Sequence, residues 1–216
     1  METAPKPMSR AVVIVNLVLT AIVFPALTLG LAGDWRWIEG WIFSLWMVAM
    51  IGGNLVYLYL KDPALLAERT KRPGSNHQKP WDRLLLTGAY ILAVVWFVIQ
   101  PLDAKRFGWS PAFPLWLKIL GGLLLIPALY LIQRAPMENT YLSTMVRVQE
   151  ERKQRVITTG VYAFVRHPLY LGCILMLAGA PLMLGSVAGL VISLIAVISL
   201  MGRSVAEERL LASELE

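Results

Sequence analysis

The chain has 216 residues, of which 57% are hydrophobic and 16% are charged, and its net charge is +6. Soluble globular domains carry more charge and less apolar content, so this composition excludes that class and predicts an integral membrane protein. The single cysteine, Cys173, excludes an intrachain disulfide and a cysteine-based metal site. The basic residues gather in particular loops, which indicates membrane topology, and we expect no nucleic-acid partner.

Four apolar runs occupy residues 1–134, and each is long enough to cross a bilayer, for which about 20 residues are needed. They are Ala11–Ala32, Trp37–Leu60, Leu84–Leu102 and Pro114–Arg134. We expect this region to be a four-span scaffold. A polar stretch with six basic residues, Lys61–Arg83, separates the second run from the third, and we expect its bases to meet anionic lipid headgroups.

A polar segment, Ala135–Pro168, precedes one final apolar run, Leu169–Gly202. As a single helix this run would be about 50 Å long, well beyond the hydrocarbon core of a bilayer. Gly179-Ala180-Pro181 and Gly185-Ser186 are turn signals inside it. We therefore predict a Gly/Pro-broken hairpin. Its arms would be Leu169 to about Leu182 and Ser186 to Gly202.

The expected fold is all-α: a polytopic membrane helical bundle with about six membrane segments in a single transmembrane domain, residues 1–216. Residues 135–216 would form the cofactor-binding region and the catalytic hairpin. Six crossings place sixteen of the twenty Lys and Arg residues on one side. By the positive-inside rule, both termini and the active site are predicted to be cytoplasmic. The oligomeric state stays open.

The most informative stretch lies where the polar segment meets the final run. It reads Gly-Val-Tyr-Ala-Phe-Val-Arg-His-Pro-Leu-Tyr-Leu-Gly, from Gly160 to Gly172. Pro168 suits the first turn of a helix, and the next three N–H groups would lack intrahelical partners, which makes a ready site for a carboxylate or phosphate. Arg166 and His167 add donors. Tyr162 and Tyr170 add aromatic faces for a positive centre.

A second cluster, Arg203, Glu207 and Glu208, follows the final run. Arg203 and Glu207 share a helix face, and a hairpin would return Glu207 to the face that carries His167, where it could bind an ammonium group. Plain roles stay open: such residues also anchor helices at headgroups, and Glu208 is expected to mark the membrane exit. His167 suits hydrogen bonding or packing as well as proton transfer. With His77 the only other histidine, no metal is expected.

Taken together, these clusters resemble the isoprenylcysteine carboxyl methyltransferase family over about the last third of the chain. The resemblance is carried by Val156-Ile157-Thr158-Thr159-Gly160-Val161-Tyr162, Arg166-His167-Pro168-Leu169-Tyr170-Leu171-Gly172 and Arg203-x3-Glu207-Glu208. It implies a membrane enzyme that binds S-adenosylmethionine without a Rossmann domain, in a pocket open to the cytosol. The expected cofactor contacts are Gln149, Gln154, Val156, Ile157, Tyr162, Arg166, His167, Pro168, Leu169, Tyr170 and Glu207. The expected catalytic residues are Arg203, Glu207 and His167.

The reaction that the resemblance implies is methyl transfer to a lipophilic or small acceptor drawn from the membrane, foremost a prenylcysteine-type carboxylate. A phospholipid amine or a small thiol stays open as the acceptor. Two other classes also stay open: an NADPH-dependent sterol reductase, which shares a similar Arg-His-Pro-x-Tyr element, and a membrane scaffold whose charges only set topology. Family members usually continue with Gly-Tyr-x2-Tyr and a basic tail, whereas this sequence ends at Glu216. We expect loss of that tail to weaken closure over the cofactor.

Overall fold

The computed structural model describes residues 8–70, 80–145, 149 and 152–215, with side chains up to residue 209. Within these residues the chain is all-helical and contains no strand. The α-helices are α1 (Arg10–Ala32), α2 (Ile38–Lys61), α3 (Pro63–Arg69), α4 (Pro80–Pro101), α5 (Leu115–Glu138), α6 (Pro168–Leu184) and α7 (Val187–Leu215). A π-helix, η1 (Leu102–Phe107), extends α4, and a 3-10 helix, η3 (Gly160–Ala163), precedes α6.

Five of these helices are long and apolar enough to cross a membrane: α1, α2, α4 with its π-helical extension, α5, and α7 as far as Arg209. Large apolar side chains stay uncovered along them, such as Ile126 on α5 and Leu194 on α7, which are 66% and 62% exposed. Such surfaces suit lipid rather than water. The chain is therefore a multi-pass integral membrane protein, as its composition predicts.

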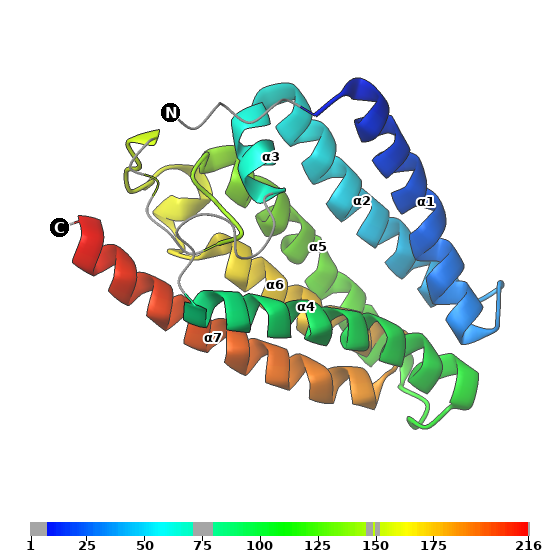
Figure 1. The fold of residues 1–216 in the computed structure, drawn as a ribbon. Coiled ribbons are helices and arrows are strands. Elements are labelled where there is room, and N and C mark those ends of the chain that lie inside the picture. Colours follow the sequence, from blue (N-terminus) through cyan, green and yellow to red (C-terminus); the bar gives the residue numbers. More distant parts are fainter. Residues whose placement is uncertain (1–7, 71–79, 146–148, 150–151, 216) are drawn as a thin grey trace.

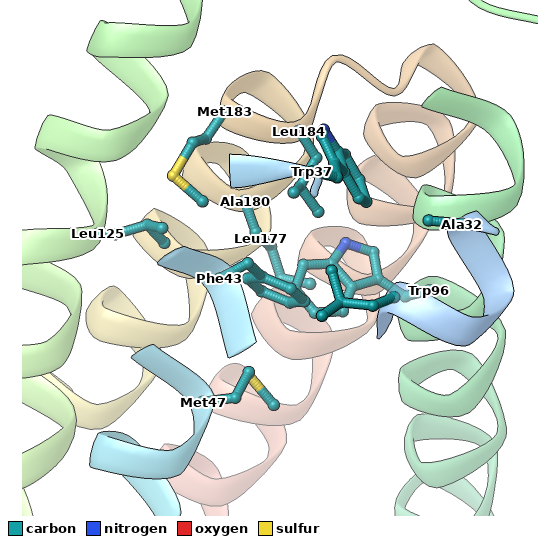
Figure 2. Packing of buried hydrophobic residues seen from close by; sticks show 11 residues of the cluster. Ala32, Trp37, Phe43, Met47, Trp96, Leu125, Leu177, Ala180, Met183 and Leu184 are labelled. Atoms are coloured by element: carbon teal, nitrogen blue, oxygen red, sulfur yellow. The ribbon is translucent and has the colours of Figure 1, made fainter. Parts of the chain in front are cut away.

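The helices pack in pairs around α6. Figure 1 shows α1 beside α2, α5 beside α6, and α4 beside α7, and each of these pairs is in contact. The main core lies between α2, α4 and α6, where Phe43 meets Trp96 edge-on with ring centroids 6.0 Å apart and Leu177 of α6 lies beside them (Figure 2). The aromatic core thus ties the scaffold helices to the helix that begins with the Arg-His-Pro sequence.

Helices α5 and α6 approach each other closely. A Cβ built on Gly121 would overlap the backbone nitrogen of Met183 and would lie 2.6 Å from the carbonyl oxygen of Gly179. A Cβ on Gly172 would lie 2.8 Å from Cγ1 of Ile132. Small residues allow membrane helices to approach this closely. Close contacts with α5 therefore hold α6 near both of its ends, at Gly172 and at Met183.

The final apolar run breaks after Leu184, where Gly185 takes φ +83° and α7 begins two residues later. The sequence predicted a break at Gly179-Ala180-Pro181 as well as at Gly185-Ser186. The first of these is wrong, because α6 continues through Pro181. Proline cannot donate to the carbonyl of Leu177, but the Ser193 hydroxyl on α7 donates to that oxygen instead. Membrane helices tolerate proline when a neighbour satisfies the freed carbonyl in this way.

Asp103 fixes the start of α7 against the end of α4. This carboxylate is 1% exposed, and its Oδ2 accepts hydrogen bonds from Ser186 Oγ at 2.6 Å, Ser110 Oγ at 2.7 Å and the Ala188 N–H at 3.0 Å. A carboxylate at a helix start also favours the helix dipole. The first turn of α7 is thereby held beside η1, so that α7 runs along α4.

Helices α6 and α7 run antiparallel. Ser193 of α7 bonds to Leu177 of α6, while Glu207, further along α7, bonds to Tyr170 near the start of α6. The last part of α7 consequently lies beside the first turn of α6. This arrangement brings together two groups of residues that are about 40 positions apart in the sequence.

Candidate functional site

A pocket opens where α6 begins, between that helix, the loop that follows α5, and the last turns of α7. Every residue expected in the site lines it, with the exception of Gln149. These lining residues are Gln154, Val156, Ile157, Tyr162, Arg166, His167, Pro168, Leu169, Tyr170, Arg203 and Glu207. Since they come from three separate elements, their common location follows from the antiparallel packing of α6 and α7.

The first turn of α6 supplies free backbone donors. Pro168 occupies the first helical position, and the N–H groups of Leu169 and Tyr170 make no hydrogen bond to any described residue. The expectation of a third free donor is wrong, because the N–H of Leu171 already bonds to the His167 carbonyl at 3.0 Å. Leu171 is the residue at which the first turn closes. The two remaining donors and the positive end of the helix dipole suit an anionic group.

Two glutamates of α7 contact this first turn. Tyr170 Oη donates to Glu207 Oε2 at 2.7 Å, and His167 Nε2 lies 3.0 Å from Glu208 Oε1. The His167 and Tyr170 rings stack, with centroids 5.3 Å apart and planes 10° from parallel. Glu208 was expected only to mark the membrane exit, whereas here it orients the imidazole. Negative charge is thus concentrated next to the helix start.

Arg203 is held by two fixed acceptors. Its Nε donates to Asp82 Oδ1 at 3.0 Å and its Nη2 to the carbonyl oxygen of Thr144 at 2.6 Å. The side chain of Asp82 is 0% exposed and that of Arg203 only 14%. Two bonds in different directions fix the plane of a guanidinium. The orientation of the Arg203 guanidinium at the pocket is therefore fixed before any ligand binds.

Asp82 was missed by the sequence analysis, which placed it in the basic stretch before the third span. In the structure it lies in the first turn of α4, which begins at Pro80. Pro at the start of a helix, followed by an acidic residue in the first turn, is a signal that would have extended the predicted helix to include it. No sequence signal pairs Asp82 with Arg203, because the two lie 121 positions apart.

Arg69 is a second residue of that basic stretch that the structure assigns differently. It was expected to face lipid headgroups, but it lines the pocket, and its Nη1 donates to the Leu142 carbonyl at 3.2 Å. Burial lowers the pKa of Arg69 from its ordinary value. The rest of the stretch includes residues 71–79, which lie outside the described part of the chain.

Gln149 lies behind the pocket wall and does not line it. Its side chain is 0% exposed, its Nε2 donates to the Tyr141 carbonyl at 2.7 Å, and its N–H donates to Gln154 Oε1 at 2.8 Å. Arg152 also donates to its Oε1, at 2.9 Å. Gln149 therefore ties together two segments of the loop, Tyr141 and Gln154 among them, that do line the pocket.

Tyr162 tests whether the pocket fits a polar ligand. Its hydroxyl is buried and makes no hydrogen bond to a described residue. Burial raises the pKa of Tyr162 to about 12, so the group stays protonated at neutral pH and is available as a donor. A buried donor without a partner costs about 1–3 kcal/mol, and a ligand that accepts from it would offset that cost. The donors of this pocket thus match the acceptor groups of a small zwitterion such as an amino acid moiety.

Comparison with known proteins matches part of the chain to a family. Residues 123–213 match the family described as the isoprenylcysteine carboxyl methyltransferase (ICMT) family, whereas searches of curated proteins and of solved structures found no match. The matched segment contains η3, α6, all residues expected in the site, and α7 as far as residue 213, while Arg69 and Asp82 precede it. The resemblance found in the sequence is therefore confirmed over this segment: residues 123–213 match the ICMT family, a family of membrane methyltransferases.

Proposed function

We propose that this protein transfers a methyl group from S-adenosylmethionine to the carboxylate of a lipophilic acceptor of the prenylcysteine type. One observation carries the proposal: the α6 N–H groups, the Glu207 carboxylate and the Tyr162 hydroxyl border the same pocket. When bound, S-adenosylmethionine supplies an activated methyl group on a sulfonium, together with a carboxylate and an ammonium group. The pocket offers a complementary partner for each of these charges.

The start of α6 and the last turns of α7 would bind different groups of the cofactor. The N–H groups of Leu169 and Tyr170 suit the cofactor carboxylate, because they lie at the positive end of a helix dipole. Glu207 suits the ammonium group through a charge-assisted hydrogen bond. The aromatic ring of Tyr162 suits the sulfonium, and the apolar side chains of Val156 and Ile157 suit the adenine ring.

Arg203 is the proposed acceptor-binding residue. Its guanidinium is already fixed by Asp82 and Thr144, so it can orient a carboxylate without losing much conformational freedom on binding. A carboxylate is ionised at neutral pH and needs no general base to become a nucleophile. The chain then has only to align the acceptor oxygen with the methyl group and to exclude water, and such positioning can supply much of the rate.

We further infer that the chain crosses the membrane six times and that the site faces the cytoplasm. Helix α6 has 17 residues and would be about 26 Å long, close to the ~30 Å hydrocarbon core. With α6 and α7 both crossing, the start of α1 and the end of α7 lie on one side, together with the site. Sixteen of the twenty Lys and Arg residues then lie on that side, which the positive-inside rule assigns to the cytoplasm.

Calorimetry of the purified protein tests the cofactor. We expect binding of S-adenosylhomocysteine and none of NADPH. Binding of NADPH alone would favour the reductase class. If the wild type binds neither compound, and the calorimetric traces of the His167→Ala and Glu207→Ala variants are the same as its own, the protein is a scaffold.

An acceptor assay tests the substrate. Labelled S-adenosylmethionine would be supplied with a prenylcysteine carboxylate, a phosphatidylethanolamine or a small thiol. We expect label on the prenylcysteine carboxylate as a base-labile ester. Label on the amine or thiol instead would replace the carboxylate in the proposal and keep the cofactor.

A further inference from the structure

A second hollow lies on the other side of α5, away from the candidate site. It is a cavity of about 670 Å³ between α2 and α5, floored by Met183 of α6. Its lining is mostly apolar and includes Ile42, Trp46, Leu125, Ile126 and Leu129. A neighbouring cavity of about 450 Å³ lies at the end of α5, between that helix and η3. Tyr130 and Arg134 line both cavities, which therefore form one groove, named here the α5 groove.

The polar side chains of α2 and α5 that lie in or beside the wall of the α5 groove, those of Trp46, Asn54 and Gln133, are satisfied within the protein. Trp46 Nε1 donates to the Leu125 carbonyl at 2.9 Å, and Gln133 Nε2 donates to the Ala49 carbonyl at 2.9 Å. Asn54 in turn donates to Gln133 Oε1 at 2.6 Å. Apart from Tyr130 and Arg134 at its outer end, the wall between α2 and α5 thus presents mainly hydrocarbon. A hydrocarbon chain fits such a wall better than water does.

Two opposite charges at the end of α5 are left without ion-pair partners. Arg134 and Glu138 lie four residues apart, and neither forms an ion pair with the other or with another described residue. The Arg134 guanidinium lies over the Tyr130 ring, 5.9 Å from its centroid. The Glu138 carboxylate rests against Gly160, where a Cβ would lie 2.6 Å from Oε1. Arg before Glu is the weaker order for a pair at this spacing, and since neither charge is paired with a described residue, both remain available to a ligand.

The order of these features along α5 matches one kind of molecule. From the membrane interior outward the groove presents an apolar wall, then Arg134, then Glu138, with about 6 Å between the last two along the helix axis. A glycerophospholipid with an amine headgroup presents acyl chain, phosphate and ammonium in the same order. Phe164, at the outer rim, is 90% exposed, as suits an aromatic side chain at the headgroup level.

We propose that the α5 groove binds a zwitterionic glycerophospholipid. One acyl chain lies between α2 and α5, the phosphate contacts Arg134, and the ammonium group contacts Glu138. No residue of this groove lines the candidate site, so the lipid is a ligand of a separate site and the proposal does not depend on the methyl-transfer reaction.

Native mass spectrometry of the detergent-purified protein, titrated with phosphatidylethanolamine or phosphatidylglycerol, tests this site. We expect the wild type to bind phosphatidylethanolamine more tightly. Arg134→Gln should weaken binding of both lipids about tenfold, the loss of a charge-assisted hydrogen bond to phosphate. Glu138→Gln should abolish the preference for phosphatidylethanolamine and leave binding of phosphatidylglycerol intact. Arg10→Gln, which removes an exposed charge outside the groove, is the control and should change neither.

A steric variant keeps the test independent of charge. Gly122 lines the apolar part of the groove, and a Cβ there meets only Met183 Sδ, at 3.7 Å. Gly122→Leu should fill the groove and weaken the binding of both lipids, and its unfolding temperature should stay close to that of the wild type. Equal binding by the wild type and all groove variants would overturn the proposal. A wild-type preference for phosphatidylglycerol would also overturn it and would indicate a general site for anionic lipids.

Discussion

Glu207 is held towards the pocket by a single hydrogen bond from Tyr170, which leaves its other carboxylate oxygen without a described partner. If this oxygen binds the ammonium group of the cofactor, Glu207→Gln removes a charge-assisted bond of about 1.5–3 kcal/mol. The dissociation constant for S-adenosylhomocysteine should then rise about 10- to 100-fold, as measured by calorimetry.

Glu208→Gln is the matched control for this measurement. The neighbouring glutamate contacts His167 and does not line the pocket. We expect its replacement to change cofactor affinity by less than about threefold, since it removes a charge beside the imidazole, keeps an acceptor oxygen for it, and removes no contact to the ligand. Equal losses in the two variants would show that the general negative charge of this surface matters and that Glu207 has no specific role.

Asp82 should act through Arg203 and not through the cofactor. Asp82→Asn leaves the largely buried guanidinium without its carboxylate, and we expect kcat to fall at least tenfold while the affinity for S-adenosylhomocysteine stays within about twofold. Breaking a buried pair also costs about 3–5 kcal/mol, so the unfolding temperature should fall.

A double-mutant cycle separates the two effects. If the pair is the relevant unit, Asp82→Asn combined with Arg203→Gln should cost no more activity than Arg203→Gln alone. An activity loss in Asp82→Asn that is matched by loss of cofactor binding would contradict a positioning role, because it would mean that the whole pocket had been disrupted.

At the scale of elements, the contact between α5 and α6 decides where the site forms. Gly121→Ala would drive a methyl group into the backbone of α6 at Met183, whereas the adjacent Gly122→Ala meets only Met183 Sδ at 3.7 Å. We expect Gly121→Ala to destabilise the protein by at least 1–3 kcal/mol, roughly the cost of overpacking. Gly122→Ala should be neutral or slightly stabilising, because alanine favours helix.

Thermal unfolding in detergent, followed by circular dichroism, compares these two glycine variants. S-adenosylhomocysteine binding at low temperature adds a second readout, since a displaced α6 would carry Leu169 and Tyr170 away from α7. Similar unfolding temperatures for both variants would mean that the helices separate easily and that the close contact has little role in stability.

The helices that could be predicted from the sequence are those marked by a long run of apolar residues. The sequence places the first four membrane helices within a few residues of α1, α2, α4 and α5. It fails at Pro181, where a local breaker signal is overridden by a hydrogen bond from a residue on the next helix. It also fails for α3 and η3, which are short and lie in polar segments where apolar periodicity carries little information.

For the whole molecule, the proposed topology puts the start of α1 and the turn between α1 and α2 on opposite sides of the membrane. Single cysteines at Arg10 and Arg36, introduced into a Cys173→Ala background, would test it in intact cells. We expect an impermeant maleimide to label Arg36→Cys only, and to label Arg10→Cys only after the membrane is permeabilised. The reverse pattern would place the site on the non-cytoplasmic side.

The sequence by itself determined the class of this protein, because bilayer thickness and the cost of burying charge act on each segment separately. It also determined the chemistry at the ends of the last apolar run, where helix-start geometry and residue types are local properties. Only the tertiary structure decided that Arg69 lines the pocket, that Asp82 holds Arg203 there, and that Arg134 and Glu138 stay apart beside an apolar groove. These features depend on which helices lie side by side, and that follows from packing between segments that no local pattern records.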